Sequence, residues 1–171
     1  GELKTLIDMV EDGRMSDKTT YSEVVTDFSD LVKEAVSDPD FPFDWELMSQ
    51  NLGGMDRGNV GIIFARPEVG KPTFCSFLAS SYLKQGKRVV YWANEEPAPK
   101  IKLRIIQSYF GLTRHAMEEE MHMLHSIYTD RIEPYLTVMD SVGTSMAELN
   151  DYAQLNEPDV MFCDQLDKFR I

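Results

Sequence analysis

A glycine–lysine pair and three carboxylates stand where they could act on a phosphate anion. Gly70-Lys71 follows a short apolar run and precedes a helical pattern, so the pair falls at the junction of a loop and a helix. Free backbone N–H groups and the positive end of the helix dipole meet an anion at such a junction, and a lysine reaches its outer oxygens. Glu95, Glu96 and Asp164 supply acids that could hold a metal ion or activate a water.

The loop around this pair departs from the phosphate-binding consensus G-x-x-x-x-G-K-[ST] at two positions. Ala65 replaces the first glycine, and Pro72 replaces the residue whose hydroxyl ligates Mg²⁺. Proline offers neither a hydroxyl nor an N–H, although the first turn of a helix tolerates it. Thr73 carries a hydroxyl one residue later, and we expect it to contact a phosphate or the metal. An ordinary strand–helix turn is the alternative.

The acids follow two further apolar runs. Asp164 comes directly after Val160–Cys163, which predicts a strand with an acid at its carboxyl end, the edge where α/β sheets bind ligands. Glu95 and Glu96 come after the strand pattern at 88–93, and a carboxylate there could polarise a water. A solvated helix start is the alternative for the Glu-Glu-Pro step, because acids suit that end of the helix dipole.

The elements that must position these residues alternate along the chain. Hydrophobic periodicity predicts strands at 61–65, 88–93, 135–140 and 159–167, and helices at 43–52, 73–84, 99–110, 113–132 and 145–155. Such alternation is typical of a parallel sheet with right-handed crossovers, and it brings the carboxyl ends of the strands to one rim. We therefore expect an α/β fold that places Lys71, Glu95 and Asp164 at the same rim.

The N-terminal part differs in character and is interpreted as a separate segment, residues 1–40, ahead of a core at 41–171. Residues 1–19 are polar, with a short amphipathic helix, and a longer helix is predicted at 21–36 with Thr20 as its cap and Glu23 completing a capping box. Residues 37–42 are expected to be an acidic, proline-containing linker. The helix packs either on its own domain or on a neighbouring subunit.

Composition and charge narrow the class of protein. The chain has 171 residues, 43% of them apolar, which suits one globular α/β domain. Its net charge is −12, and residues 1–57 carry 14 acidic against 5 basic side chains. This surface repels phosphate backbones, so non-specific binding to nucleic acid is expected to be weak, although a basic channel in an oligomer is not excluded.

Cysteine usage and hydropathy indicate a compartment. Cys75 and Cys163 fall in apolar runs and are interpreted as buried thiols, which predicts a reducing, cytoplasmic location. No apolar run approaches the ~20 residues of a membrane span, so we expect no membrane association. His122 and His125 share one helix face and could bind a metal, but an exposed, Met-rich amphipathic helix is the preferred interpretation.

Taken in order, these motifs resemble the ATPase domain of RecA-like hexameric replicative DNA helicases, of the DnaB and phage primase–helicase type. The resemblance covers residues 41–167. It is carried by Leu52-Gly53-Gly54-Met55-Asp56-Arg57-Gly58, by the loop 65–71, by Tyr91-Trp92-Ala93-Asn94-Glu95-Glu96-Pro97 with the helix to Arg104, and by Phe162-Cys163-Asp164-Gln165-Leu166. The N-terminal helix is similar to that family's interdomain linker helix.

The resemblance implies a RecA-like P-loop NTPase fold of three layers, with ATP and Mg²⁺ as cofactors and DNA unwinding as the activity. By this analogy Lys71 binds phosphate, Asp164 is the Walker B acid, and Glu95 is the catalytic glutamate with Glu96 as its competitor. The implied cofactor-binding residues are Arg66, Glu68, Val69, Gly70, Lys71, Pro72, Thr73, Asp164 and Gln165, with Asp164 and Thr73 at the metal. The implied partners are further copies in a hexameric ring, and single-stranded DNA.

Departures from the family pattern modify this interpretation. Pro72 replaces the Mg²⁺-ligating hydroxyl, and the chain ends shortly after Asp164, before the family's DNA-binding loops, arginine finger and the strand that lies between the P-loop and Walker B strands. We expect either a truncated helicase or a shortened relative that pairs those two strands directly. A non-catalytic assembly module with a degenerate nucleotide site is the alternative function. A third hypothesis is a RecA-like ATPase of a different assignment, such as recombination or clock-type regulation, against which the stretch Asn94-Glu95-Glu96-Pro97 argues.

Overall fold

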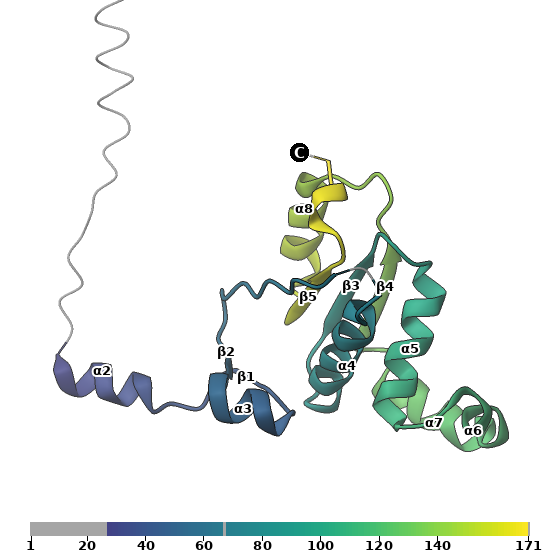
Figure 1. The fold of residues 1–171 in the computed structure, drawn as a ribbon, viewed down its shortest axis with the longest axis horizontal. Coiled ribbons are helices and arrows are strands. Elements are labelled where there is room, and N and C mark those ends of the chain that lie inside the picture. Colours follow the sequence, from purple (N-terminus) through teal and green to yellow (C-terminus); the bar gives the residue numbers. More distant parts are fainter. Residues whose placement is uncertain (1–26, 67, 171) are drawn as a thin grey trace, which may run out of the picture. The chain divides into compact units, whose positions relative to one another are not determined.

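The computed structural model describes residues 27–66 and 68–170, which fall into two compact units that divide between Ser37 and Asp38 (Figure 1). The predicted helix within residues 1–19 and the predicted cap at Thr20 lie outside the described residues. The predicted boundary between residues 40 and 41 stays a prediction.

The first unit contributes helix α2, Phe28–Ala35, which matches the described part of the predicted helix. Its apolar side chains face solvent within the unit, with Phe28 77% and Leu31 48% exposed. Lys33 and Asp30 form an ion pair of 2.8 Å on the same helix. The surface on which this helix packs stays a prediction.

The second unit is built on a three-stranded parallel sheet, which confirms the predicted α/β class. Strand β3, Val89–Ala93, lies between β4, Leu136–Asp140, and β5, Val160–Cys163. Val89 is in register with both Leu136 and Val160. All five residues of β3 are buried, as expected for the central strand of a sheet covered on both faces.

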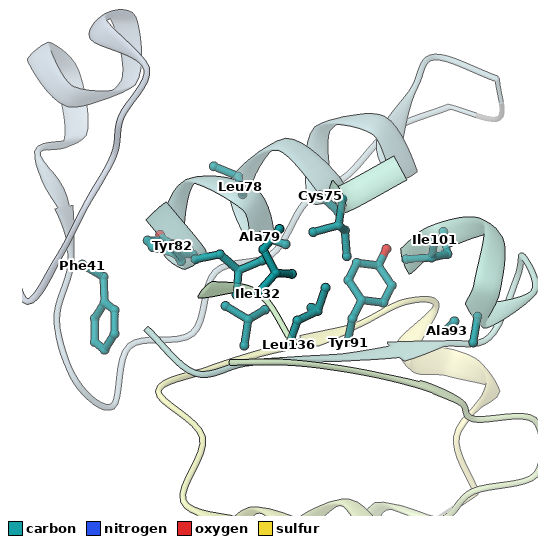
Figure 2. Packing of buried hydrophobic residues seen from close by; sticks show 14 residues of the cluster. Phe41, Cys75, Leu78, Ala79, Tyr82, Tyr91, Ala93, Ile101, Ile132 and Leu136 are labelled. Atoms are coloured by element: carbon teal, nitrogen blue, oxygen red, sulfur yellow. The ribbon is translucent and has the colours of Figure 1, made fainter. Parts of the chain in front are cut away.

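Helices cover both faces of this sheet, so the sheet is the middle of three layers. Alternate residues of β3 point to opposite faces, so Tyr91 packs with α4, Lys71–Lys84, and α5, Ala98–Phe110, in the main core (Figure 2). Trp92 points the other way and packs with Leu149 of α8, Met146–Asn156. Two further helices of this unit are α6, Arg114–Glu119, and α7, Met121–Arg131.

Local signals fix the ends of these helices. Ser145 accepts a hydrogen bond from the N–H of Glu148, whose carboxylate accepts from the N–H of Ser145, forming a capping box at the start of α8. Gly111 ends α5 with φ +67°, the left-handed conformation that glycine adopts without a Cβ clash. The predicted single helix over 113–132 is wrong, because the helix is interrupted at Glu120, between α6 and α7. No glycine or proline in the sequence marks this interruption.

The strand predicted at 61–65 is wrong. Residues 59–66 form neither helix nor strand, and the side chains of Ile62 and Phe64 are 70% and 88% exposed. The direct pairing of this segment with β5, offered for the alternative of a shortened relative, is not found, since within residues 27–66 and 68–170 β5 pairs with β3 alone. An apolar run becomes a strand when a neighbour takes its backbone hydrogen bonds, and no described strand does so here.

The predicted linker at 37–42 is also wrong in part. Phe41–Pro42 forms strand β1, which pairs antiparallel with β2, Gly54–Met55; helix α3, Glu46–Leu52, lies between the two strands in the sequence. Phe41 is 5% exposed and meets Tyr82 of α4 edge to face at 6.0 Å. The buried ring of Phe41 therefore packs the β1–β2 pair against the main core.

Two further expectations concern thiols and membranes. Both thiols are free, as predicted; Cys75 is buried, whereas Cys163, also predicted to be buried, is half-buried. In the described parts of the chain, no helix is long and apolar enough to cross a lipid bilayer.

Candidate phosphate-binding site

The start of α4 presents backbone donors beside the predicted lysine. Gly70 caps the helix with φ +94° and ψ 22°, a left-handed conformation that strains any residue with a Cβ. Lys71 is the first helical residue, and no side chain caps this end. The N–H groups of the first turn have no partner within the helix, so Lys71 and Thr73 offer donors while Pro72 offers none.

Three segments far apart in the sequence converge on the Lys71 ammonium. Its Nζ lies 2.7 Å from Oδ1 of Asp164, at the end of β5, and 3.5 Å from Oε2 of Glu95, just after β3. The predicted phosphate-binding lysine, Walker B acid and catalytic glutamate therefore meet at one rim of the sheet. The arrangement carries one positive and two negative charges.

Asp164 is the buried member of this cluster. Its side chain is 1% exposed, and its Oδ2 is buried without a hydrogen-bond partner among the described residues. Burial alone would lower the pKa of Lys71, but the hydrogen bonds and charges of Asp164 and Glu95 outweigh it and raise that pKa above its ordinary value. The lysine therefore stays charged at neutral pH, and one carboxylate oxygen of Asp164 has no partner.

The two adjacent glutamates have different surroundings. Glu96 accepts two hydrogen bonds from the Arg104 guanidinium, at 2.9 and 3.1 Å, and pairs with Lys100 at 2.6 Å. The Arg104 and Lys100 hydrogen bonds lower the pKa of Glu96 to about 2, which makes it a poor proton acceptor. Glu95 is 44% exposed and touches the lysine, so the geometry favours Glu95 over Glu96 as the base.

A cavity of about 410 Å³ opens beside this cluster. Its lining includes most of the predicted cofactor-binding residues together with both glutamates: Ala65, Arg66, Glu68, Gly70, Lys71, Pro72, Thr73, Glu95, Glu96, Arg104 and Gln165. Two predicted residues do not line it: Val69 is 68% exposed, and the side chain of Asp164 is 1% exposed and reaches the site through its ion pair with Lys71. Arg104 lines the cavity although it was not among the predicted site residues; it lies in α5 and its guanidinium donates two hydrogen bonds to Glu96.

The residues present fit a nucleotide phosphate chain and a magnesium ion. A lysine and the first turn of a helix suit an anion, and the partnerless Oδ2 of Asp164 suits a hard cation. Mg²⁺ is usually bound by one or two carboxylates, with substrate phosphates and waters completing the shell, so a single buried acid is sufficient protein ligation. In residues 27–66 and 68–170, no group of three or more His, Cys, Asp or Glu residues could hold a metal ion, either at this site or around His122 and His125.

Cys75 of α4 and Tyr91 of β3 are buried next to each other in the main core (Figure 2), and both feel the charge of Asp164. Burial, followed by the charge of Asp164, raises the pKa of the Cys75 thiol to about 11. Burial also raises the pKa of Tyr91. Both groups stay protonated at neutral pH, which removes Cys75 as a nucleophile.

No family model matches the chain. The chain is 33% identical to DNA repair protein RadA of Mycolicibacterium smegmatis over 96 residues, which is 54% of this chain and 20% of that protein. It is 33% identical over 98 residues to DNA repair protein RadA of Campylobacter jejuni, and 28% identical over 114 residues to DNA repair protein RadA of Brucella abortus. These matches span 21% and 24% of the two proteins.

The matched region is thus between a fifth and a quarter of the length of these relatives, and about half of this chain or somewhat more. The similarity supports a relation to the RecA-like ATPase superfamily and does not single out the DnaB-type helicases within it.

Proposed function

We propose that this chain is the nucleotide-binding part of an ATP-driven DNA helicase of the hexameric replicative type. The observation that carries the proposal is the convergence of Lys71, Asp164 and Glu95 from three separate segments at the carboxyl end of a parallel sheet. The motif order supports the helicase assignment, and the partial similarity to RadA supports the broader relation to RecA-like ATPases.

Each residue of the cluster has a role in this proposal. Lys71 and the N–H groups at the start of α4 bind the outer phosphates of ATP. Asp164 holds Mg²⁺, which when bound would neutralise phosphate charge. Glu95 accepts the proton of the attacking water, while Arg104 keeps Glu96 ionised and out of that role. Ring assembly and contacts with single-stranded DNA are further parts of the proposal, and no residue is assigned to them.

A second candidate function is a non-catalytic module that binds or assembles with a helicase. Pro72 favours it, because a proline at the second helical position removes both the hydroxyl that would ligate Mg²⁺ and one backbone donor to phosphate. The acidic surface also favours it, since a net charge of −12 opposes DNA binding.

Titration calorimetry with Mg-ATP separates the two functions. The helicase-derived site predicts that Lys71→Ala abolishes binding. It also predicts that Pro72→Thr strengthens Mg²⁺-dependent binding by about tenfold, which is the gain in affinity if the new hydroxyl contributes about 1.4 kcal/mol as a metal ligand. Lys84→Ala is the matched control, because Lys84 is an exposed lysine at the other end of the same helix. Equal binding by all four proteins, or none by any of them, would favour the assembly module.

A further inference from the structure

The cluster around Lys71 carries little positive charge for the anion that the proposed function assigns to it. Lys71 is paired with Asp164 at 2.7 Å and with Glu95 at 3.5 Å, so one positive and two negative charges leave these groups with a net −1. Pro72 withholds a backbone donor from the same turn of α4. A triphosphate stays negatively charged after one Mg²⁺ binds, so a further cation of the chain would stabilise it there.

Arg66 and Arg104 both line the cavity beside this cluster, and Arg104 is the better placed of the two. Arg66 is exposed in a segment that forms neither helix nor strand. The side chain of Arg104 is 25% exposed and extends from α5. That helix is fixed to the sheet at its start, where the N–H of Ala98 donates to the carboxylate of Asp140 at 3.1 Å. A guanidinium can bind a phosphate through two parallel hydrogen bonds, which a lysine cannot do.

The acid that holds Arg104 has a second cationic partner. Glu96 accepts two hydrogen bonds from the Arg104 guanidinium, at 2.9 and 3.1 Å, and Nζ of Lys100 lies 2.6 Å from Oε2 of the same carboxylate. Arg104 lines the cavity, whereas Lys100 does not and its side chain is 64% exposed. Glu96 therefore keeps one cation when Arg104 turns into the cavity, so the carboxylate is not left without a partner.

We propose, on the basis of the nucleotide site described under the proposed function, that Arg104 is a phosphate-binding residue that exchanges partners. It leaves Glu96 for the terminal phosphate of a nucleoside triphosphate, and Lys100 alone then holds Glu96. The proposed base Glu95 directly precedes Glu96, so Arg104 lies on the side of the site where a water attacks the terminal phosphate. The exchange therefore makes the site prefer a triphosphate over a diphosphate.

Titration calorimetry with Mg-ATP and with Mg-ADP tests this exchange, and the ratio of the two affinities is the readout. Arg104→Gln is expected to weaken ATP binding by at least about tenfold and ADP binding by less than about threefold. Arg104→Lys keeps the charge but loses the two parallel hydrogen bonds, and its ratio is expected to lie between those of Arg104→Gln and the wild type. Lys102→Gln is the matched control, because Lys102 is a cation of the same helix that does not line the cavity and lies over the ring of Tyr128.

Glu96→Gln separates an exchange of partners from a static ion pair. Releasing Arg104 from its acid is expected to raise the ratio of ATP to ADP affinity by about threefold or more. This gain is expected to vanish in the double variant that also carries Arg104→Gln, whereas a general effect of removing one negative charge would persist there. Lys100→Gln is expected to lower the ratio, because Glu96 then has no second cation when Arg104 leaves.

The outcomes separate this inference from the proposed function. Unchanged affinity ratios in Arg104→Gln and Glu96→Gln, with binding still abolished by Lys71→Ala, would overturn the exchange and leave the nucleotide site standing. A wild-type chain that binds neither nucleotide would overturn both. If circular dichroism shows that Arg104→Gln is unfolded, the Arg104→Lys and Glu96→Gln proteins decide, and an unchanged ratio in both of them would overturn the exchange.

Discussion

Replacing Lys71 by methionine tests the buried half of the site through the stability of the fold. The ammonium lies 2.7 Å from Asp164, whose side chain is 1% exposed and whose other oxygen has no partner among the described residues. Methionine keeps the length of the side chain and removes its charge, which leaves a buried carboxylate uncompensated. Breaking a buried ion pair in this way costs about 3–5 kcal/mol.

Urea unfolding of the whole chain at pH 7 measures this loss, with a double-mutant cycle to isolate the pair. Lys71→Met is expected to lower the free energy of unfolding by about 3 kcal/mol or more. Adding Asp164→Leu is expected to restore most of that loss, because an apolar pair of similar volume replaces a buried ion pair at little cost. Glu95→Gln acts on the same lysine from a 44% exposed position at 3.5 Å, and is expected to cost less than about 1 kcal/mol.

The reasoning is refuted if Lys71→Met and Glu95→Gln destabilise equally. It is also refuted if Asp164→Leu adds to the loss caused by Lys71→Met, because the carboxylate would then not be the group that the lysine neutralises.

Three further predictions follow from the described contacts. The pKa of Glu96 is lowered from 4.5 to about 2, so its contribution to stability is complete above pH 4.5 and is lost as the pH falls through about 2. Glu96→Gln should therefore reduce the loss of stability between pH 4.5 and pH 2 by on the order of 1 kcal/mol, measured as the free energy of unfolding against pH. Ser145→Ala should lower the free energy of unfolding by about 1 kcal/mol through loss of the capping box, and an equal loss in an Ala variant of exposed Thr129 would contradict this. In a Cys163→Ser background, Cys75 should react with a thiol reagent at pH 8 no faster than the protein unfolds, and rapid labelling of the native chain would show that the thiol is accessible.

The elements whose signals are local were predictable from sequence. The apolar run that became β3 and the periodic run that became α5 needed no distant partner to be recognised, and Gly111 marked the end of the helix. The convergence of Glu95 and Asp164 was predictable as well, because each follows a strand and neighbouring parallel strands end at one rim. Lys71 reaches the same rim from the start of α4, although residues 59–66 ahead of it form no strand.

What the sequence left open depends on tertiary neighbours. Residues 61–65 have the composition of a strand, but pairing requires an adjacent edge, and composition does not reveal whether one is available. The choice of Glu95 over Glu96 rested on the family resemblance alone, for a similar reason. It is made by Arg104 and Lys100, whose positions relative to the two acids are known only once α5 is seen to begin at Ala98.

Ligand-induced stabilisation tests the central claim most directly, namely that Lys71, Asp164 and Glu95 surround a site for the phosphate chain of a nucleotide. At ATP tenfold above its dissociation constant with Mg²⁺ present, binding adds about 1.4 kcal/mol to the stability of the folded chain, which raises the Tm by roughly 3–6 °C. The account predicts this rise for ATP, a much smaller one for AMP, and none for ATP with Lys71→Ala. Equal shifts with ATP and AMP, or a full shift in the Lys71→Ala variant, would contradict it.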